Sequence, residues 1–300
     1  MSRLQRVTQS MMSSQFLRNL NTNMNQMDKL QNQLSTGQRI NKPSDDPVGI
    51  SFSMRYRSEL SANDQYQSNA SAATSWLSYT DTVLGQAGDV LQKLRESAVK
   101  ASNGTNPQEA LDTIKSEASQ LYEQMVDIGN SQFNGKYVFN GELTDVQPYT
   151  LANAQNEQAD EGTIRFEIGV GVKIGVNASA NKAFGLPTDP DNVFKITQDF
   201  VTALGKGDFT GINKAIGDFD SRMNKVLDMR SDTGAKMNRI ELSEDRLKDV
   251  AINVASLQSK TEDADMSVVI TNMKVAENVY QASLSTGAKI IQPSLVDFLR

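Results

Sequence analysis

Apolar residues in a seven-residue repeat, found near each end of the chain, most constrain the fold. Residues 8–36 contain neither proline nor glycine, so a long uninterrupted helix is possible there. A spacing of three and four residues joins Leu17, Leu20, Met24, Met27, Gln31 and Leu34. That spacing predicts one seam on a helix, narrower than the apolar face of a globular core helix.

The C-terminal third carries a second repeat. Its members are Ile240, Leu247, Val250, Val254, Leu257, Ala264 and Val268, with Thr261 as a polar break. The phase then shifts, and the seam continues through Val269, Met273, Ala276 and Tyr280, as it would after a stutter. Beyond Gly287 the chain ends in an apolar segment that includes Leu295 and Phe298.

Each of these seams requires a partner surface. Full burial of one Leu or Met side chain contributes about 1.5–3 kcal/mol, so a covered seam contributes on the order of 10 kcal/mol. An isolated Asn-rich helix is marginal without that burial. We therefore expect the N-terminal helix to pack against the C-terminal one, within or between subunits. The predicted assembly interface comprises Leu17, Leu20, Met24, Met27, Leu34, Val250, Val254, Leu257, Val268, Met273, Leu295 and Phe298. An ordinary intramolecular bundle is the alternative.

Composition excludes several classes of site. The chain has 36 acidic and 30 basic residues, and a net charge of −6 does not favour general nucleic-acid binding. It has no Cys and no His, which excludes zinc sites built on them, Cys nucleophiles and Ser-His pairs. No cofactor is expected, although a carboxylate-only calcium site or a two-carboxylate acid/base site stays open. No catalytic or metal-binding residues are predicted.

The chain lacks the segments that direct proteins to or through membranes. No run of about 18 apolar residues is present, so no membrane span is predicted. The N-terminal segment MSRLQRVTQSMMSSQF lacks the apolar core of a secretory signal peptide. By these rules alone the protein would be cytoplasmic.

Residues 41–47 (NKPSDDP) predict a break followed by a helix start. Pro43 and Pro47 disfavour helical angles in the residues before them. Asp46 suits the N-cap, with Pro47 at the first helical position. The paired Asp45 and Asp46 could also suggest a metal or acid/base site, but no further ligand is clustered nearby, so capping is the preferred interpretation.

The middle of the chain is helical on both sides of a β-rich stretch. Helical spacing covers residues 48–100 and 107–128, and helices resume at Val193 and Ile212. Between them, Tyr137-Val138-Phe139 and residues 163–176 predict strands. The glycines of GVGVKIGV do not fit a dinucleotide-binding spacing.

The predicted fold is mainly α with a small β-rich insertion, as an elongated hairpin-like molecule with terminal coiled-coil helices and a central helical bundle domain. The expected divisions are an assembly helix at 1–42, a helical core at 43–130 and 191–265, a β-rich inserted domain at 131–190 and a second assembly helix at 266–300.

Several motifs resemble the flagellin superfamily and, within it, the hook-filament junction proteins. The shared motifs are RVTQ at 6–9, QLSTGQRIN at 33–41, YQAS at 280–283 and LVDFLR at 295–300. KPSDDP at 42–47 and NGKYVFNG at 134–141 resemble the junction members rather than filament flagellins. The resemblance covers nearly the whole chain and is weakest between about 150 and 190. The chain departs from the family at its start, where residues 1–5 precede the segment with which family members begin.

The resemblance implies a structural adaptor outside the cell. It implies export through the flagellum without a cleaved signal peptide, helped by an export chaperone, and a ring of subunits between the other hook-associated junction protein and the filament flagellin. It also implies that the terminal segments are disordered in the free monomer and form the inner tube on assembly. No membrane partner and no nucleic acid are expected. The alternative within the family is a filament flagellin subunit. An enzyme is not expected, because the zinc-protease segment of some flagellins needs His-Glu-x-x-His and this chain has no His.

Overall fold

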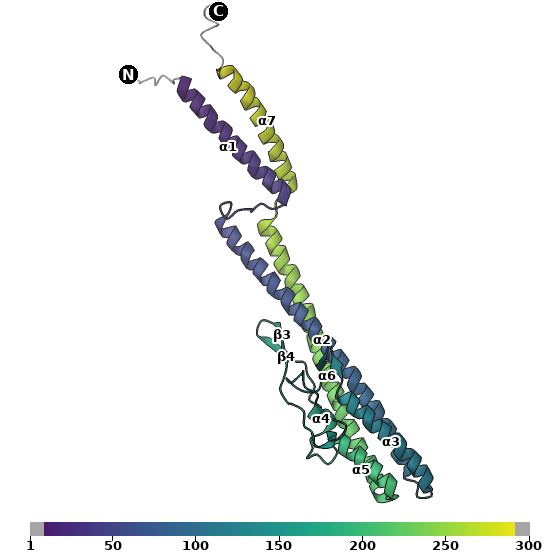
Figure 1. Cartoon of the computed structure of the whole chain (residues 1–300). Coiled ribbons are helices and arrows are strands. Elements are labelled where there is room, and N and C mark those ends of the chain that lie inside the picture. Colours follow the sequence, from purple (N-terminus) through teal and green to yellow (C-terminus); the bar gives the residue numbers. More distant parts are fainter. Residues whose placement is uncertain (1–8, 292–300) are drawn as a thin grey trace, which may run out of the picture. The chain divides into compact units, whose positions relative to one another are not determined.

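The computed structural model describes residues 9–291, and these are mostly helical (Figure 1). The helices are α1 (Gln9–Thr36), α2 (Pro47–Ala101), α3 (Gln108–Gly129), α4 (Ala180–Phe184), α5 (Val193–Lys206), α6 (Phe209–Glu262) and α7 (Met266–Ile291). Two short hairpins and the 3₁₀ turn η1 (Ala154–Asn156) lie between α3 and α4. The prediction of a mainly α fold with a small β-rich insertion is confirmed.

The chain divides into two compact units. Residues 1–61 and 251–300 make the terminal unit, and residues 62–250 make the central unit. The long helices α2 and α6 each contribute to both units. The finer division predicted from the sequence, with boundaries at 42, 130, 190 and 265, stays a prediction.

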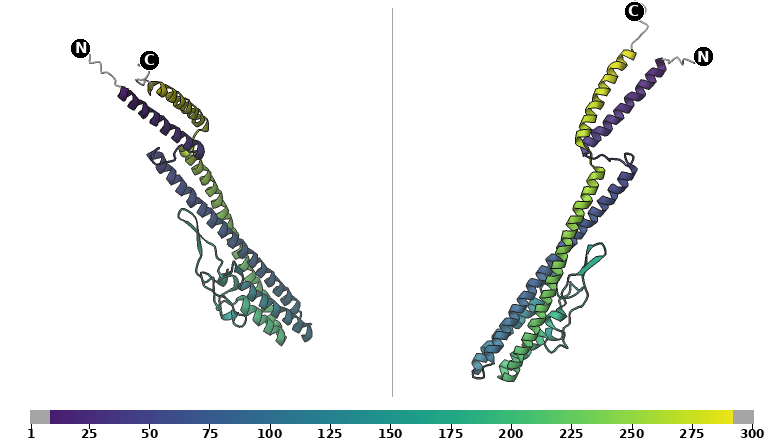
Figure 2. Two further views of the ribbon diagram at one scale, coloured as in Figure 1. Left: turned by 45° about the horizontal axis from the view of Figure 1, so that its top comes forward. Right: turned by 180° about the vertical axis from the view of Figure 1, so that it is seen from behind.

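In the central unit, α2 and α6 run side by side and the insertion lies against one side of them (Figures 1 and 2). Their apolar faces meet in a core that includes Leu77, Leu84 and Leu91 of α2 and Phe219 of α6. Side-chain bonds tie the same helices together, as where Arg230 donates to Asp81 over 2.9 Å. Helix α3 packs against α5.

The β-rich insertion contains two separate antiparallel hairpins. Strands β1 (Gln132–Phe133) and β2 (Lys136–Tyr137) form the first, and β3 (Arg165–Gly169) and β4 (Val172–Gly175) form the second. The first hairpin turns through Asn134 and Gly135, whose φ angles of 51° and 76° suit a tight two-residue turn.

The prediction of a strand at Tyr137-Val138-Phe139 was only partly right, because β2 ends at Tyr137. Val138 and Phe139 are fully buried, so packing takes them out of the hairpin and into the core. Phe139, Tyr149, Phe184 and Phe194 form an aromatic cluster there, with ring centroids 4.7–5.9 Å apart.

A buried arginine fixes the segment that closes the insertion. The Arg222 side chain on α6 is 1% exposed and donates to the Asp191 carbonyl and carboxylate over 2.7 and 2.6 Å. It also donates to the carbonyl of Lys182, at the other side of the same loop. Five donors in a fixed plane allow one guanidinium to hold several acceptors at once. The loop before α5 is therefore held against α6.

The shift of phase in the C-terminal repeat coincides with a break between two helices, because α6 ends at Glu262 and α7 begins at Met266. The Asp265 carboxylate accepts hydrogen bonds from the backbone N–H groups of Ser267 and Val268, over 2.9 and 3.2 Å. This geometry caps a new helix rather than continuing the old one. The change of phase in the repeat therefore marks a helix boundary.

Candidate assembly interface

Helices α1 and α7 lie side by side in the terminal unit (Figures 1 and 2). One stripe of each helix is at least half-buried. The stripe of α1 contains Phe16, Leu20, Asn23, Met27 and Leu30, and that of α7 contains Val269, Met273, Ala276, Tyr280, Ser283 and Gly287. The spacing of three and four residues is that of a helix packed along one face. The expectation that the two end helices pair is confirmed within one chain.

The closest approach of the pair is at Phe16 and Gly287. A Cβ added at Gly287 would lie within van der Waals overlap of the Phe16 ring, so this position has room only for a hydrogen. Glycine normally weakens a helix interior by about 0.5–1 kcal/mol relative to alanine. Here its small size is what lets the aromatic ring sit against the backbone of α7.

A second apolar stripe remains uncovered on each helix. Leu17, Met24 and Leu34 on α1 are 52%, 47% and 37% exposed, and Val268, Val275 and Val279 on α7 are 53%, 55% and 44% exposed. The first set follows the predicted seam, and the second is spaced by seven and four residues. Surfaces that align exposed apolar side chains along two neighbouring helices are typical of interaction sites. We call these six residues the open stripes.

The structure separates the residues of the predicted interface into three groups. Leu20, Met27, Met273, Val250 and Val254 are at least half-buried within the chain. Leu17, Met24, Leu34, Leu257 and Val268 are exposed. Leu295 and Phe298 lie outside the described residues.

Sequence reasoning missed members of both stripes. It left out Phe16 and Leu30 on the covered face of α1, and Val275 and Val279 on the open face of α7. A strict seven-residue repeat drifts by about 20° per heptad on a straight helix, so one seam read from it crosses two faces. Counting apolar residues at a period of 3.6 would have found Phe16 beside Leu20 and Met27.

A shallow groove runs between the two helices. Phe16, Asn19 and Leu20 of α1 and Val279, Ala282, Ser283 and Thr286 of α7 line a volume of about 300 Å³. Its α7 side is made of small side chains next to Val279 of the open stripe. Small residues permit close approach of another helix.

The connection between α1 and α2 is hydrogen-bonded to the connection between α6 and α7. Gln38, after α1, pairs with Asp263, after α6, as an antiparallel bridge. The Arg39 N–H donates to the Glu262 carbonyl over 2.6 Å, and the Ala264 N–H donates to the Gly37 carbonyl over 2.9 Å. The chain thus crosses between its helical parts through a short β-like clasp.

A buried carboxylate lies within this clasp. The Glu262 side chain is 1% exposed and accepts from Arg57 of α2 at both oxygens, over 3.0 and 2.7 Å. Gln38 and Gln258 also donate to it, each over 3.3 Å. The hydrogen bond to Glu262 raises the pKa of the Arg57 guanidinium. A bidentate pair of this kind fixes orientation as well as charge.

The two aspartates before α2 have different roles: Asp46 caps the helix, and Asp45 fixes the turn before it. Asp46 accepts from the Gly49 N–H over 2.9 Å, which confirms the predicted N-cap. Asp45 accepts from the Lys42 and Asn41 N–H groups over 3.0 and 3.2 Å, and Lys29 approaches it at 3.3 Å. The bond from Lys42 and its other partners lower the pKa of Asp45 although burial opposes them. Both carboxylates therefore stabilise the connection between α1 and α2.

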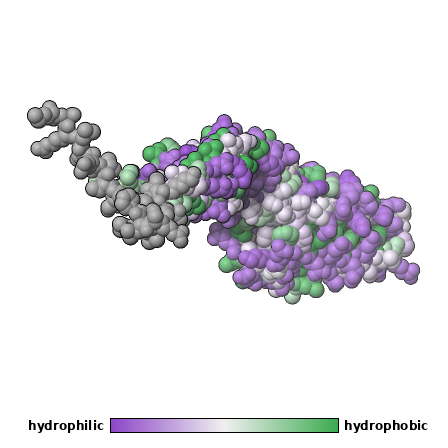
Figure 3. Space-filling model, turned by 90° about the horizontal axis from the view of Figure 1, so that it is seen from above, coloured by the Kyte–Doolittle hydropathy of each residue, from purple (hydrophilic) through white to green (hydrophobic). Residues whose placement is uncertain are grey.

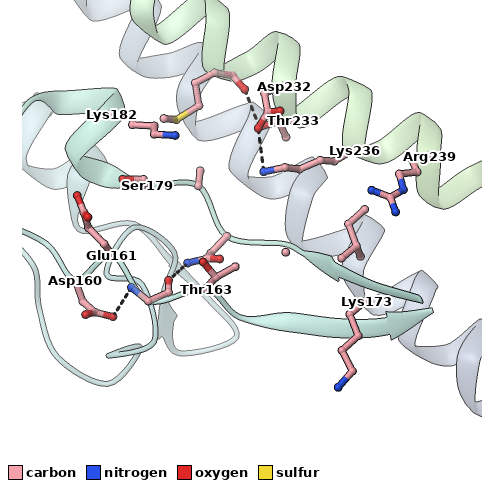
Figure 4. A pocket seen from close by; sticks show the side chains of 16 residues that line it. Asp160, Glu161, Thr163, Lys173, Ser179, Lys182, Asp232, Thr233, Lys236 and Arg239 are labelled. Atoms are coloured by element: carbon pink, nitrogen blue, oxygen red, sulfur yellow. Dashed lines mark hydrogen bonds and ion pairs between the residues drawn. The ribbon is translucent and has the colours of Figure 1, made fainter. Parts of the chain in front are cut away.

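A cavity lined by several charged side chains lies between the second hairpin, the segment before α4, and α6 (Figure 4). It encloses about 440 Å³, and its charged groups include Asp160, Lys182, Asp232 and Lys236. Lys236 pairs with Asp232 over 2.9 Å, and Asp160 accepts from the Gly162 and Glu142 N–H groups. These carboxylates hold loops and helices in place.

Two classes of site are not found in the described part of the chain. Residues 9–291 contain no cluster of three acidic, His or Cys side chains that could hold a metal ion. None of the described helices is long and apolar enough to span a membrane. On the surface, hydrophobic patches interrupt a mostly hydrophilic exterior (Figure 3).

Comparisons with known proteins agree with this architecture. The family model of the bacterial flagellin N-terminal helical region matches residues 7–144, and that of the C-terminal helical region matches residues 216–299. The flagellar hook-associated protein 3 of Escherichia coli is 24% identical, covering 93% of this chain and 94% of its own. The flagellin FlaB1 of Treponema pallidum is 28% identical, covering 78% of each chain.

Solved structures show the same fold. A putative flagellar hook-associated protein from Vibrio parahaemolyticus matches with a TM-score of 0.67 at 20% identity, covering 73% of this chain and all of its own. Hook-associated protein 3 from Legionella pneumophila matches with a TM-score of 0.62 at 17% identity, covering 69% of this chain and 98% of its own.

Proposed function

Because the chain belongs to the flagellin family, we propose that it is a structural adaptor that assembles as a ring at the junction between flagellar hook and filament. The observation that carries the proposal is the pair of open stripes, which leaves apolar surface on both terminal helices after α1 and α7 have covered one another. A further helix, from a neighbouring subunit, would cover it.

The contacts between subunits in this proposal are head-to-tail. A closed ring arises when the same two different surfaces meet repeatedly. The groove between α1 and α7 supplies one surface, and the exposed side of α1 at Leu17 and Met24 supplies the other. The neighbours above and below would be the other hook-associated junction protein and filament flagellin.

The same family membership supports export to the cell exterior through the flagellum, with a chaperone before secretion. A structural role at the junction requires no catalysis. The absence of cysteine suits a chain that is exported unfolded, because no disulfide can form prematurely.

A filament flagellin subunit is the second candidate. Alignment coverage does not separate the two candidates, because hook-associated protein 3 of Escherichia coli aligns over 93% of this chain and a filament core protein of Treponema maltophilum over 91%. The junction role is supported instead by KPSDDP at 42–47 and NGKYVFNG at 134–141, which resemble junction members rather than filament flagellins. The deciding experiment adds the purified full-length protein to isolated hook fragments and measures what grows in the electron microscope. A short collar of fixed length is expected. Long filaments would support the flagellin candidate and contradict the junction proposal.

A further inference from the structure

A groove in the central unit is open and partly aromatic. It encloses about 770 Å³ between α2, the first hairpin and the start of β3, and we call it the insertion groove. Trp76 and Phe133 lie at its base, with their rings edge to face at 5.7 Å. Lys136, Glu142 and Arg165 also line it. Aromatic surface with a few charged groups around it is typical of a binding groove.

One wall of the insertion groove is the segment that leads into β3. The Val176 N–H donates to the Ile164 carbonyl, so Ile164 points its backbone groups toward β4. Successive residues of a strand point these groups to opposite sides, and Asn69 donates to the outward carbonyl of Glu167. The backbone groups of Thr163 and Arg165, both of which line the groove, therefore point away from β4. Backbone groups that face a groove in this way can bond the backbone of an incoming turn.

The tip of the second hairpin exposes one apolar side chain of a size that fits a groove. Val170 is 87% exposed, more than any other large apolar side chain in the described part of the chain. It stands between Gly169 and Gly171, so no bulky neighbour obstructs its entry into a groove. The bond from Asn69 to Glu167 fixes the base of the hairpin against α2, which presents Val170 on a supported arm.

The tip cannot enter the groove of its own chain. Val170 directly follows β3, which begins at Arg165, and the extended chain separates the two residues by roughly 16 Å at about 3.3 Å per residue. The charges permit a contact between copies: Glu167 and Lys173 flank the tip, whereas Lys136, Arg165 and Glu142 flank the groove. Each charge beside the tip can therefore meet one of opposite sign.

We propose that Val170 of one subunit inserts into the insertion groove of the neighbouring subunit, with the turn of the second hairpin placed against the rings of Trp76 and Phe133. This contact rests on the proposed ring, because the ring supplies the neighbour. It joins two different surfaces of the same chain, which is the arrangement that closes rings. It would link central units to each other independently of the helices of the terminal unit.

Cysteine cross-linking tests the contact, and the chain has no cysteine of its own. Val170→Cys and Ser75→Cys chains are expressed together, and flagella from these cells are oxidised. Ser75 is an exposed residue that lines the groove. The matched control replaces Ser75→Cys by Ser116→Cys, an exposed serine of α3 with the same hydrogen bond to the carbonyl four residues earlier.

A disulfide-linked dimer is expected when Val170→Cys is combined with Ser75→Cys, and none is expected when it is combined with Ser116→Cys. Equal or absent bands in flagella that contain both variants would overturn the groove contact and leave the ring intact. Absence of the protein from flagella, with correctly folded variants, would instead overturn the proposed function and the contact with it. A second pair, Lys173→Cys with Ser75→Cys, should also form a cross-link. Adding Val170→Asp to the Lys173→Cys chain should abolish that cross-link, whereas adding Val146→Asp, at another exposed valine, should leave it unchanged.

Discussion

The Arg57 guanidinium donates hydrogen bonds to both oxygens of the buried Glu262 carboxylate, where α6 ends. The pair joins the start of α2 to the end of α6, and the clasp between Gln38 and Asp263 lies beside it. The Arg57–Glu262 pair therefore holds the connections between the helices of the terminal unit together.

Arg57→Ala is predicted to destabilise the terminal unit. The substitution leaves a carboxylate that is 1% exposed without its charged partner, and such a loss costs about 1–3 kcal/mol. Amide hydrogen exchange of α1 and α7 measures it. Lys274→Ala removes an exposed pair on α7, which contributes less than about 1 kcal/mol, and serves as the control. Equal protection in the two variants would contradict the fastening role.

Gly287→Ala is predicted to separate α1 from α7. The new methyl group would overlap the Phe16 ring, so one of the helices must shift away. Exchange rates of amides in both helices should rise, and a second substitution, Phe16→Leu, should partly restore them.

Gly217→Ala is the matched control, because a methyl group there meets nothing within 4 Å on α6. It should stabilise the chain by about 0.5–1 kcal/mol through helix propensity. Destabilisation by Gly217→Ala, or wild-type exchange in Gly287→Ala, would contradict the packing described here.

Arg222→Met is predicted to unfasten the loop before α5. Removing one partner of a buried ion pair typically costs about 3–5 kcal/mol, because the other charge stays buried. Thermal unfolding of the full chain should shift downward, with early exposure of residues 182–192 to protease. Lys225→Met removes the half-exposed partner of the same Asp191 and should cost much less.

Acid should weaken the same contact. Burial alone would raise the pKa of Asp191, but hydrogen bonds from Lys225 and Ser221 and the charge of Arg222 bring it below its ordinary value of 3.8. A carboxyl group with a lowered pKa contributes stability that is present above its unfolded value and is lost as the pH falls through the folded value. Denaturant unfolding measured from pH 6 downward should show this loss below about pH 4, and Asp191→Asn should reduce the slope.

The sequence predicted helices more reliably than their faces. Residues 8–36 and the capping pair Asp46 and Pro47 are local signals, and both match the structure. The repeat showed the break after Glu262 only as a change of phase, because part of its support is non-local: the bridge to Gln38 lies more than two hundred residues away in the chain. The capping residue Asp265 is the local part of that support.

The two stripes of α1 could not be separated from sequence alone. Leu17 and Leu20 belong to one heptad seam, yet α7 covers Leu20 and leaves Leu17 half exposed. Which stripe finds a partner inside the chain depends on the phase of both helices. That phase is set by packing, as where the Phe16 ring meets Gly287. The buried role of Arg222 was likewise invisible, because its acceptors, two backbone carbonyls and the Asp191 carboxylate, lie 31–40 residues earlier in the chain.

The most direct test of the account is the incorporation of Val275→Asp onto isolated hooks, compared with Asn278→Asp. Both place the same charge on an exposed position of α7, but only Val275 belongs to the open stripes. Both variants should fold with unchanged thermal unfolding, because neither side chain is buried. Immunoelectron microscopy should find Asn278→Asp at hook ends at the wild-type level and Val275→Asp at background. Equal incorporation of the two variants would contradict assembly through the open stripes.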